Sequence, residues 1–576
     1  MLNRQARRSL KGKNKFHVKD VGSVDFEALL KLEMKDETRK KLMEVLRWIK
    51  DPTAYKDVKF DGNFFFCDLA DNHKKELKRS CKVEKVTPEM EAKHPTIGAC
   101  RVFSVTEEKV VEGQDPDLPI EQLETILRER PIGHPCHNND AVKQLIGVSF
   151  DTREQRREPL LKKNICATHV DFKAWFDQLE LEEPQRAAFR FKMDGELYQF
   201  VKIPMGAVQS VEIAHLVATA LSEACVEDDD VAVSVYIDNV RFLGQREKVI
   251  RATQRFVERC RIVKAELNED TSDITALVQD EFDFLGETFD YKRGRVRNTK
   301  KIIKKILWLQ EKMLAGNWTY RQMAATFSLL FYGSNTIGIR PAPYFNALRF
   351  YREKSHKLQM NPHLWDEECD RMAPSATKEL CIWLEKVIKN DWREIKPQLA
   401  PEKWIVTDAS KYGWGALCYD GRTVETFNAP WSPEFVRSGE SAKAEPKAIL
   451  NALCRFVKPG ESVKIYTDHE ALKYSMKKGY SPGYVVNETL RMVQKFGPNV
   501  QLAFIRGVWN PADLPSRGQD EVDQQLLDAW KKACQLPDEE GGVINAAPFL
   551  EILKKSGSAK TTSEPFPASY SCLGLN

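Results

Sequence analysis

Two aspartates are spaced so that they could bind metal ions together. In THVDFKAWFDQLEL, Asp171 ends a strand-like run, and in SVYIDNVRFLG, Asp238 lies between two β-rich runs, at the natural tip of a hairpin. Taken singly, either aspartate is more often a turn residue. On adjacent strands, however, their carboxylates would converge. A pair of divalent cations about 3.5–4 Å apart needs such oxygen ligands to support phosphoryl transfer.

Four further carboxylates are arranged in the last third of the chain. Asp408 ends the strand-like run WIVTDAS, Glu445 opens an apolar helical run, Asp468 ends VKIYTD, and Asp513 begins a short helix after NPA. Glu440 competes with Glu445, which we prefer because its alanine-rich context is more helical. Single acids at such places are often helix caps. Four in this order predict a second two-metal site.

The elements that must position these acids follow from periodicity. From 101 to about 290, short apolar strands alternate with amphipathic helices, which predicts an α/β or α+β domain. From 300 to 392 the pattern is helical, and from 403 to 517 strand-like runs return, followed by helices. In IIKKILWLQEKML one face is apolar and lysines occupy most of the rest: Ile302, Ile303, Ile306, Leu307 and Leu309 form the stripe.

Composition bounds the function more loosely. The net charge of +4 does not by itself indicate a nucleic-acid partner, although the first twenty residues carry seven basic residues and one acidic residue. The thirteen cysteines form no C-x-x-C pair, which argues against a zinc finger or a disulfide framework and favours an intracellular protein, cytoplasmic or nuclear. No apolar run is long enough for a membrane span. The Ser-, Thr- and Pro-rich end predicts a disordered tail.

Four motifs in order resemble the reverse transcriptase family: D-x-x-x-x-aromatic, P-x-G, Y-x-D-x and F-L-G. They are formed here by Asp171 with Phe176, by KIPMGAVQS, by YIDN and by residues 284–286. The resemblance implies a right-hand fold of fingers, palm and thumb, with Asp171 and Asp238 as palm metal ligands and Asn239 beside them. Phe176 would be the steric gate that excludes a ribonucleotide 2′-hydroxyl; a plain core aromatic is the alternative. The other substrate-binding positions that it implies are Pro204, Gly206, Gln209 and Tyr236.

The same resemblance extends upstream, and it has two departures. RVFSVTEEK and RERPIGHPCHNND look like fingers segments, so Arg130, and less directly Arg128, would bind the incoming triphosphate; solvated arginines are the alternative. The family usually has a second aspartate where this chain has Asn239, a weaker ligand for a hard cation. The lysine often found in an N-x-x-K context is absent from AELNEDTSD.

The second set of acids resembles RNase H, and the string NPADLPSR looks like the version found in retroelements. This resemblance implies a mixed five-stranded sheet and makes Asp408, Glu445, Asp468 and Asp513 ligands of a metal pair. Many relatives have a histidine before the last aspartate, whereas this chain offers Arg506. A product-release role for a histidine is therefore not supported.

The order of polymerase, helical connection and RNase H is that of retroelement polyproteins. The helical segment RQMAATFSLLFYGSNTIGIRPAPYFNALRFY and the NPADLPSR string look most like tyrosine-recombinase elements of the DIRS type, including kinetoplastid VIPER elements, with gypsy-type long-terminal-repeat elements as the runner-up. The expected segments are an N-terminal extension with a basic arm and helices (1–95), fingers and palm (96–298), a helical thumb or connection (299–395), an RNase H-like domain (396–520) and a partly disordered tail (521–576).

These resemblances imply an RNA-directed DNA polymerase with RNase H activity that uses two Mg²⁺ ions per site, with Mn²⁺ as the other ion considered. Its partners would be an RNA template, a DNA primer, the RNA–DNA hybrid, deoxynucleoside triphosphates and other retroelement-encoded proteins, but no membrane. The lysine-rich face at 300–312 would follow the duplex, or it is an ordinary solvated face. Asn239 motivates two alternatives: a decayed RNA-binding scaffold, and an RNase H with a silent polymerase.

Overall fold

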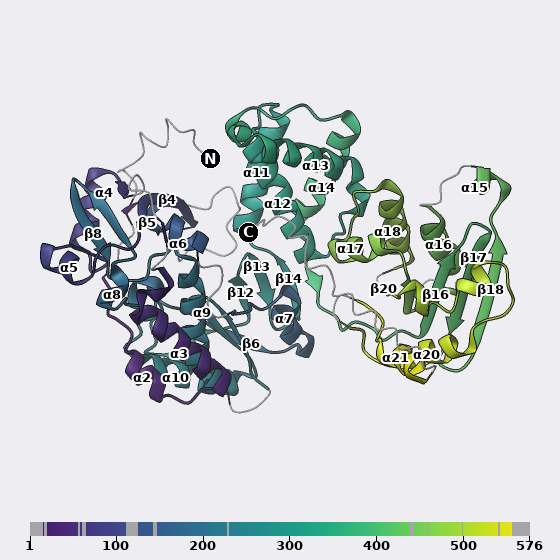
Figure 1. Cartoon of the computed structure of the whole chain (residues 1–576), viewed down its shortest axis with the longest axis horizontal. Coiled ribbons are helices and arrows are strands. Elements are labelled where there is room, and N and C mark those ends of the chain that lie inside the picture. Colours follow the sequence, from purple (N-terminus) through teal and green to yellow (C-terminus); the bar gives the residue numbers. More distant parts are fainter. Residues whose placement is uncertain are drawn as a thin grey trace. The chain divides into compact units, whose positions relative to one another are not determined.

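The computed structural model has a mixed α/β fold (Figure 1). The chain divides into two compact units. One unit comprises residues 1–305 and 390–396, and the other comprises 306–389 and 397–576. The border at 305/306 falls inside helix α11 (Lys300–Leu314). The structure describes residues 15–16, 20–55, 58–59, 65–110, 125–141, 147–226, 230–437, 443–458, 460–497, 499–539 and 542–555.

The centre of the first unit is a four-stranded sheet, here called the Asp171 sheet, in the order β11-β6-β10-β9. Its neighbouring strands are all antiparallel. Helices α9 (Val208–Ser222) and α10 (Arg246–Ile262) pack on it, with Val170, Val240 and Phe242 buried in their shared core. The strands are β6 (Cys166–Asp171), β9 (Ala232–Tyr236), β10 (Asn239–Gly244) and β11 (Val278–Gln279).

A second sheet adjoins the Asp171 sheet through a smaller core that contains Ala167, Leu243 and Phe289. Its strands are β12 (Glu281–Phe284), β13 (Glu287–Asp290), β14 (Arg295–Asn298) and β15 (Arg393–Glu394), in that order and antiparallel. The F-L-G motif at 284–286 forms the turn between β12 and β13, where Leu285 and Gly286 have positive φ. This turn is the one that the sequence predicted.

Residues 20–95 belong to the first compact unit, where their strands pair with later strands. β2 (Phe66–Asp68) pairs with β4 (Arg101–Val110), and β3 (Val83–Lys85) pairs with β8 (Glu196–Phe200), which forms a hairpin with β7 (Arg190–Met193). β1 (Lys15–Phe16) pairs with β5 (Thr125–His134), which is antiparallel to β4. The helices of this segment are α2 (Phe26–Lys31), α3 (Asp36–Lys50), α4 (Asp71–Arg79) and α5 (Pro88–Lys93). The rest of the predicted basic arm lies outside the described residues.

The predicted helical segment is confirmed and opens with α11, whose buried side chains in the described structure are Ile303, Ile306, Leu309 and Met313. Ile302 and Leu307 of the predicted stripe are only half-buried. After it come α12 (Tyr320–Ile337), α13 (Phe345–Met360) and α14 (Pro374–Lys389). Residues 306–389 belong to the same compact unit as residues 397–576. Within this unit, the Asn487 side chain donates to the Ala342 carbonyl at 2.7 Å.

The last sheet, here called the Asp408 sheet, is the mixed five-stranded sheet that the resemblance implied. Its order is β18-β17-β16-β19-β20, with β16, β19 and β20 parallel and the other pairs antiparallel. Helix α16 (Ala444–Phe456), α17 (Glu470–Lys478) and α18 (Tyr484–Phe496) contribute to one core. The strands are β16 (Lys403–Ala409), β17 (Gly413–Tyr419), β18 (Val424–Pro430), β19 (Val463–Thr467) and β20 (Val500–Phe504).

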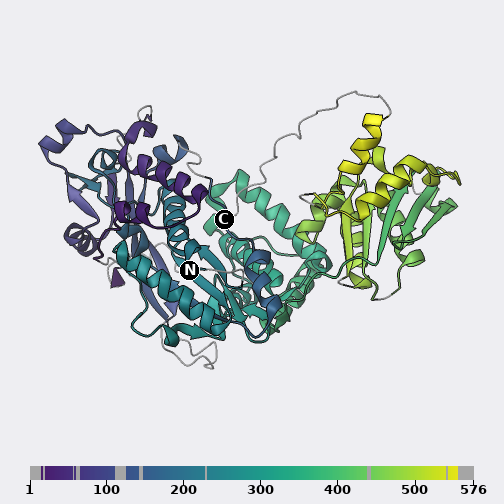
Figure 2. The ribbon, with the colours of Figure 1, turned by 90° about the horizontal axis from the view of Figure 1, so that it is seen from below.

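Part of the predicted tail is folded onto this sheet. Helices α20 (Gln524–Cys534) and α21 (Ala547–Lys555) form a second core with it through Trp530 and Phe549 (Figures 1 and 2). The apolar residues of α20 recur at a helical spacing, but that spacing does not show which face of which sheet they cover, so this packing was not predicted. Residues 556–576, predicted to be disordered, lie outside the described residues.

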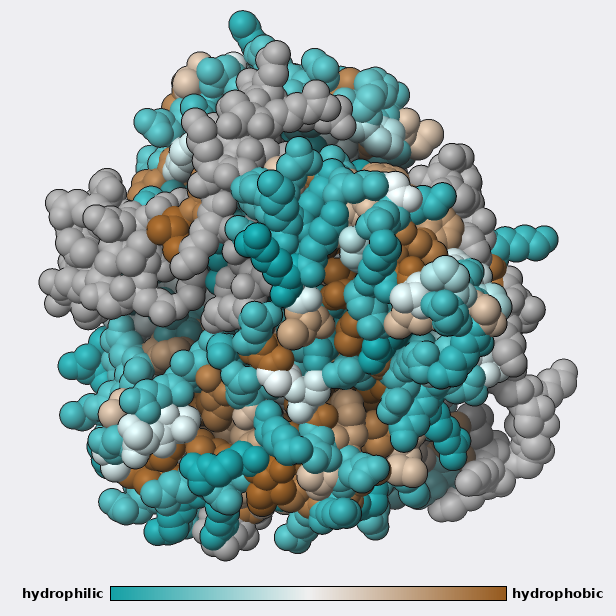
Figure 3. All heavy atoms as spheres, turned by 90° about the vertical axis from the view of Figure 1, so that its left-hand side faces the viewer, coloured by the Kyte–Doolittle hydropathy of each residue, from teal (hydrophilic) through white to brown (hydrophobic). Residues whose placement is uncertain are grey.

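Apolar side chains are scattered over the face of the molecule seen in Figure 3, with hydrophilic side chains between them. Isolated apolar residues of this kind are normal on a protein surface. Among the described residues, no helix is both long enough and apolar enough to span a lipid bilayer.

Candidate active sites

The turn that carries Asp238 has an unusual backbone. Tyr236 pairs with Asn239, so Ile237 and Asp238 form a two-residue hairpin loop between β9 and β10. Ile237 has a φ of 60°, a left-handed conformation that a β-branched residue rarely adopts and that costs about 1–3 kcal/mol. Its amide N–H donates to Nδ1 of the buried His215 at 3.3 Å. The surroundings therefore impose the geometry of this turn.

The strand pairing brings Asp171 and Asp238 side by side. Asp171, at the end of β6, lies directly opposite Asn239, the first residue of β10. The amide of Phe172 donates to the Asp238 carbonyl at 3.0 Å. The two acids that the sequence singled out are therefore on adjacent strand ends.

The environment of Asp238 is half-buried and polar. Burial raises the pKa of its carboxyl group, and the positive charge of Arg130 acts in the opposite direction. The Asn239 side chain donates to Asp238 Oδ1 at 3.0 Å. Asn239 thus binds the neighbouring carboxylate and adds no negative charge of its own.

Asp171 is held by two residues that the sequence reasoning did not select. Asn268 donates from its side chain to Asp171 Oδ2 at 2.9 Å and from its backbone to the Asp171 carbonyl at 2.8 Å. Glu269 accepts from the Asp171 amide at 2.9 Å. Both belong to AELNEDTSD, where the expected lysine was missing, and the asparagine of that N-x-x-K context was the only available signal.

Phe176 lies on a short 3-10 turn, η5 (Trp175–Gln178), five residues after Asp171. The indole of Trp175 donates to the Ala214 carbonyl at 2.9 Å. The Gln178 amide donates to the Lys173 and Glu266 carbonyls at 2.6 and 2.8 Å. Phe176 itself is half-buried against the main core. Its ring therefore stands on a turn whose neighbours are fixed.

The P-x-G motif packs against the strand that carries the two fingers arginines. The Gly206 amide donates to the Gly133 carbonyl at 3.1 Å, and a β-carbon at Gly206 would come within 2.5 Å of that oxygen. Gln209, near the start of α9, is 1% exposed, and among the described residues neither polar atom of its amide has a hydrogen-bond partner. A buried amide in this state is suited to a ligand.

The remaining predicted substrate-binding residues are Pro204, Tyr236, Arg128 and Arg130. Pro204 is buried, and Tyr236 is half-buried with its ring 5.2 Å from that of Phe150. Arg128 and Arg130 both pair with Glu107, at 3.0 and 2.9 Å. Burial raises the pKa of the Glu107 carboxyl group, but the charges of Arg130 and Arg128 outweigh this effect, and the pKa is lowered. Of the two arginines, the charge of Arg130 also acts on Asp238.

In the second unit, Asp408, Glu445 and Asp468 meet at one point. Asp408 lies near the end of β16, Asp468 follows β19, and Glu445 is in the first turn of α16. One ligand atom from each lies within 4.8 Å of the other two. Glu445 Oε1 accepts from the Ala409 amide at 2.8 Å, whereas its buried Oε2 has no hydrogen-bond partner among the described residues. Glu440 lies outside the described residues.

The electrostatics of these three acids favour a cation. Burial, reinforced by the charges of Asp468 and Asp513, raises the pKa of Asp408 to about 6. Burial and the charges of Asp468 and Asp408 raise the pKa of Glu445 to about 9. Burial also raises the pKa of Asp468. Buried carboxylates this close repel one another unless a cation or protons compensate, so a divalent ion fits this donor set.

Asp513 lies beside this group rather than in it. It starts α19 (Asp513–Ser516), its side chain is 43% exposed, and Arg517 pairs with it at 2.8 Å. Its charge nevertheless raises the pKa of both Asp408 and Asp468. The structure therefore brings three of the four predicted acids together and holds the fourth nearby.

Two residues that support this site were not selected from the sequence. The buried Asn510 side chain donates to the Thr407 carbonyl at 2.9 Å and to Asp408 Oδ1 at 3.2 Å. Gly507 approaches Asp468 so closely that a β-carbon there would lie 2.9 Å from Asp468 Oδ2. Both lie near or in the NPADLPSR string. Arg506, by contrast, lies over the ring of Trp509, at 4.8 Å.

Residues 122–289 match the family described as reverse transcriptase (RNA-dependent DNA polymerase). The matched segment includes the Asp171 sheet with Asp171, Phe176, Asp238 and Asn239, and it covers well under half of the 576 residues. The match supports RNA-directed DNA polymerase activity for this segment. None of the curated proteins matches the chain.

Among solved structures, the chain is similar to three of a foamy viral protease–reverse transcriptase. The dRH form in complex with double-stranded DNA has a TM-score of 0.40 at 12% identity over 85% of this chain and 83% of that one. A second complex with double-stranded DNA has 0.38 at 11%, over 85% and 98%. A complex with an RNA/DNA hybrid has 0.39 at 11%, over 85% and 64%.

Proposed function

We propose that this chain is the RNA-directed DNA polymerase of a retroelement and that it also cleaves the RNA strand of the RNA–DNA hybrid. The observation that carries the proposal is the pairing of β6 with β10. It sets Asp171 beside the strained hairpin of Asp238, inside the segment that matches the reverse transcriptase family. The three-acid cluster of the Asp408 sheet supports the second activity.

In the polymerase site, the chain's own residues bind and orient. Asp171 and Asp238 would hold two Mg²⁺ ions, or Mn²⁺, which when bound activate the primer hydroxyl and neutralise charge on the phosphates. Arg130 would bind the triphosphate of the incoming nucleotide. The buried Gln209 amide is available to the template or nucleotide, and Gly206 allows a close approach of the backbone. Phe176 would stand against the sugar and exclude a 2′-hydroxyl.

In the RNase H-like site, Asp408, Glu445 and Asp468 would bind the ions and Asp513 would complete the set from its exposed position. Glu445 holds a proton at neutral pH when no cation is bound, because its pKa is about 9. Ion binding would release that proton, which couples metal affinity to pH. Asn510 keeps the Asp408 carboxylate oriented toward the cluster.

Asn239 favours a second candidate function. Since its side chain donates to Asp238 and brings no charge, this chain has one carboxylate fewer at the hairpin than the family usually has. A decayed polymerase would then be an RNA-binding scaffold, or an RNase H with a silent polymerase. The fixed turn under Phe176 and the intact acids of the second site weigh against general decay.

The lineage and the partners are also proposals. The NPADLPSR string supports a DIRS-type origin over a gypsy-type one, and three of its residues, Asn510, Asp513 and Arg517, contact one another or the acid cluster. The partners would be an RNA template, a DNA primer, their hybrid, deoxynucleoside triphosphates and other proteins of the element.

Primer extension on an RNA template with deoxynucleotides and Mg²⁺ tests the polymerase. We expect extension by the wild type, loss of at least about a hundredfold in Asp238→Ala, and a gain in Asn239→Asp. Cleavage of a labelled RNA–DNA hybrid should be lost in Asp408→Asn. Glu44→Gln and Glu434→Gln, exposed acids outside both sites, are the matched controls. Extension that only Asn239→Asp supports would establish a silenced polymerase, and no extension by either form would favour the scaffold.

A further inference from the structure

A buried ion pair ties the N-terminal segment to the turn that carries Phe176. Lys82, just before β3, places its ammonium 2.7 Å from Asp177 Oδ2, and the two side chains are 10% and 12% exposed. Lys82 is itself anchored, since its carbonyl accepts from the Val201 amide at 2.8 Å. This contact gives residues 20–95 a link to the polymerase site that the sequence did not reveal.

This pair is one of several anchors of the turn, and it is the one that holds the Asp177 carboxylate. Ala174, directly before η5, has a φ of 47°, in the left-handed region. The Trp175 side chain donates to a backbone carbonyl of α9. The Gln178 side chain donates to the backbone carbonyls of residues 173 and 266. The Asp177 amide donates to the Ala174 carbonyl at 2.8 Å, but its carboxylate is held by Lys82. Asp177 is the residue next to Phe176, so Lys82 restrains one side of the ring's support.

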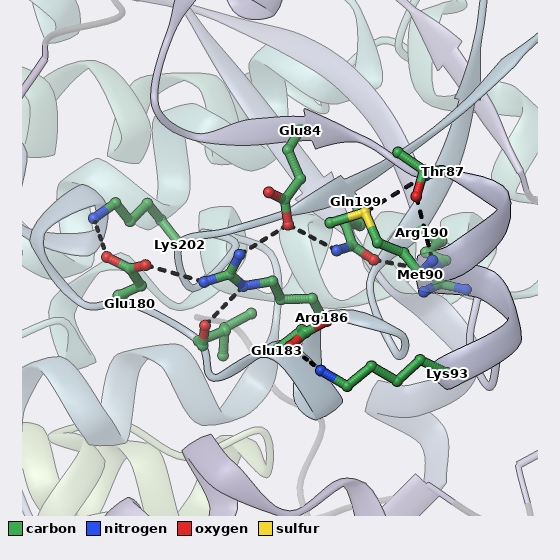
Figure 4. Close-up of polar contacts among 11 residues, drawn as sticks. Glu84, Thr87, Met90, Lys93, Glu180, Glu183, Arg186, Arg190, Gln199 and Lys202 are labelled. Atoms are coloured by element: carbon green, nitrogen blue, oxygen red, sulfur yellow. Dashed lines mark hydrogen bonds and ion pairs between the residues drawn. The ribbon is translucent and has the colours of Figure 1, made fainter. Parts of the chain in front are cut away.

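Three cations offset the burial of the Asp177 carboxylate, and Lys82 has the largest effect of the three. Burial raises the pKa of Asp177, and the charges of Lys82, Lys202 and Arg130 oppose that rise. Lys202 is itself engaged by Glu180 at 3.0 Å (Figure 4). Figure 4 also shows Arg186 joining Glu180 to Glu84 on β3, so the segment that contains Lys82 and β3 has a second link to this part of the fold. Without Lys82 the buried carboxylate loses its nearest cation, and the turn must shift or take up a proton.

We propose that Lys82 is a positioning residue for sugar selection: through Asp177 it holds η5 so that the Phe176 ring cannot recoil from a ribonucleotide. This inference rests on the proposed polymerase function. A side chain that sterically excludes one hydroxyl group must be positioned to less than the width of an atom. A small shift of η5 would therefore weaken the exclusion of the ribose 2′-hydroxyl and still allow a deoxynucleotide to bind.

The experiment is single-nucleotide extension with a deoxynucleotide and with the matching ribonucleotide, compared by the ratio of their kcat/KM values. We expect Lys82→Met to reduce this ratio about tenfold, mainly through a lower KM for the ribonucleotide, and Lys82→Arg to restore most of it. Lys85→Met is the matched control, because Lys85 lies only three residues further along, at the end of β3, but forms an exposed pair with Glu196. Phe176→Ala sets the ratio that complete loss of the ring produces.

Asp177→Asn, which keeps the volume and removes the charge, should lower the ratio as Lys82→Met does, and the double variant should add little. A purely structural defect would reduce both kcat/KM values together and leave the ratio unchanged, which overturns the inference. The inference is also overturned if either folded variant discriminates like the wild type while Phe176→Ala does not. If neither the wild type nor Asn239→Asp extends a primer, the proposed function fails and the inference falls with it.

Discussion

At the scale of single residues, the clustered carboxylates Asp408, Glu445 and Asp468 all have a raised pKa. Glu445 has a pKa of about 9 and Asp408 a pKa of about 6, because both are buried among other acids. The folded state therefore binds protons that the unfolded chain has already lost above pH 4.5. Such groups stabilise the metal-free protein at low pH and lose that contribution as pH rises through their folded pKa values.

This difference predicts a pH dependence. In EDTA, the free energy of unfolding of the second unit should fall as the pH rises from about 6 to about 9, with a slope of up to ~1.4 kcal/mol per pH unit from Glu445. Glu445→Gln should flatten the dependence, and Glu434→Gln should leave it as in the wild type. Denaturant titration at several pH values measures it. A wild-type curve as flat as that of Glu445→Gln would contradict the assignment.

At the scale of elements, helices cover both faces of the Asp408 sheet. The helices on one face, α20 and α21, belong to the segment that was predicted to be a partly disordered tail. Trp530 of α20 and Phe549 of α21 are fully buried against Val406, Leu417 and other residues of this sheet. Burying one large aromatic side chain stabilises a fold by about 3–5 kcal/mol as judged by its replacement with alanine.

Truncation tests the role of these helices. A chain ended after Asp520 should lose the fold of the Asp408 sheet or melt at least about 5 °C lower, because an apolar face of the sheet becomes exposed. A chain ended after Lys555 keeps both helices and should melt like the full chain. Circular dichroism melting distinguishes the two. Equal melting temperatures for all three chains would mean that α20 and α21 contribute nothing to stability.

At the scale of the whole molecule, the two carboxylate sites lie in different compact units with separate cores. Units with separate hydrophobic cores commonly unfold as separate cooperative units. The activities should also be separable, since each set of acids belongs to its own unit.

Calorimetry tests this separation. The full chain should show two unfolding transitions. Trp530→Ala, in the core of the second unit, should lower one of them by about 5 °C or more and leave the other within about 1 °C. Asp238→Ala should keep RNase H cleavage within about twofold of the wild type. A single transition that shifts as a whole would show that the units unfold as one.

The sequence by itself determined the parts that depend on local pattern. The strand ends at Asp171 and Asp408, the hairpin tip at Asp238, and the helical segment after 300 were predicted and are present. The alternation of apolar residues in strands, their helical spacing and the turn-forming residues are all local features of the sequence. Strands, helices and turns can therefore be predicted from neighbouring positions alone. The family match then covers the segment in which the first motifs were found.

The tertiary structure alone decided which distant residues support the acids. Asn268 holds Asp171 from 97 positions away, Asn510 holds Asp408 from 102 positions away, and Lys82 reaches Asp177. It also decided that residues 20–95 pair with later strands and that α20 and α21 cover the last sheet. Such contacts have no period and no fixed spacing, because they depend on how the chain folds back and not on what stands beside each residue.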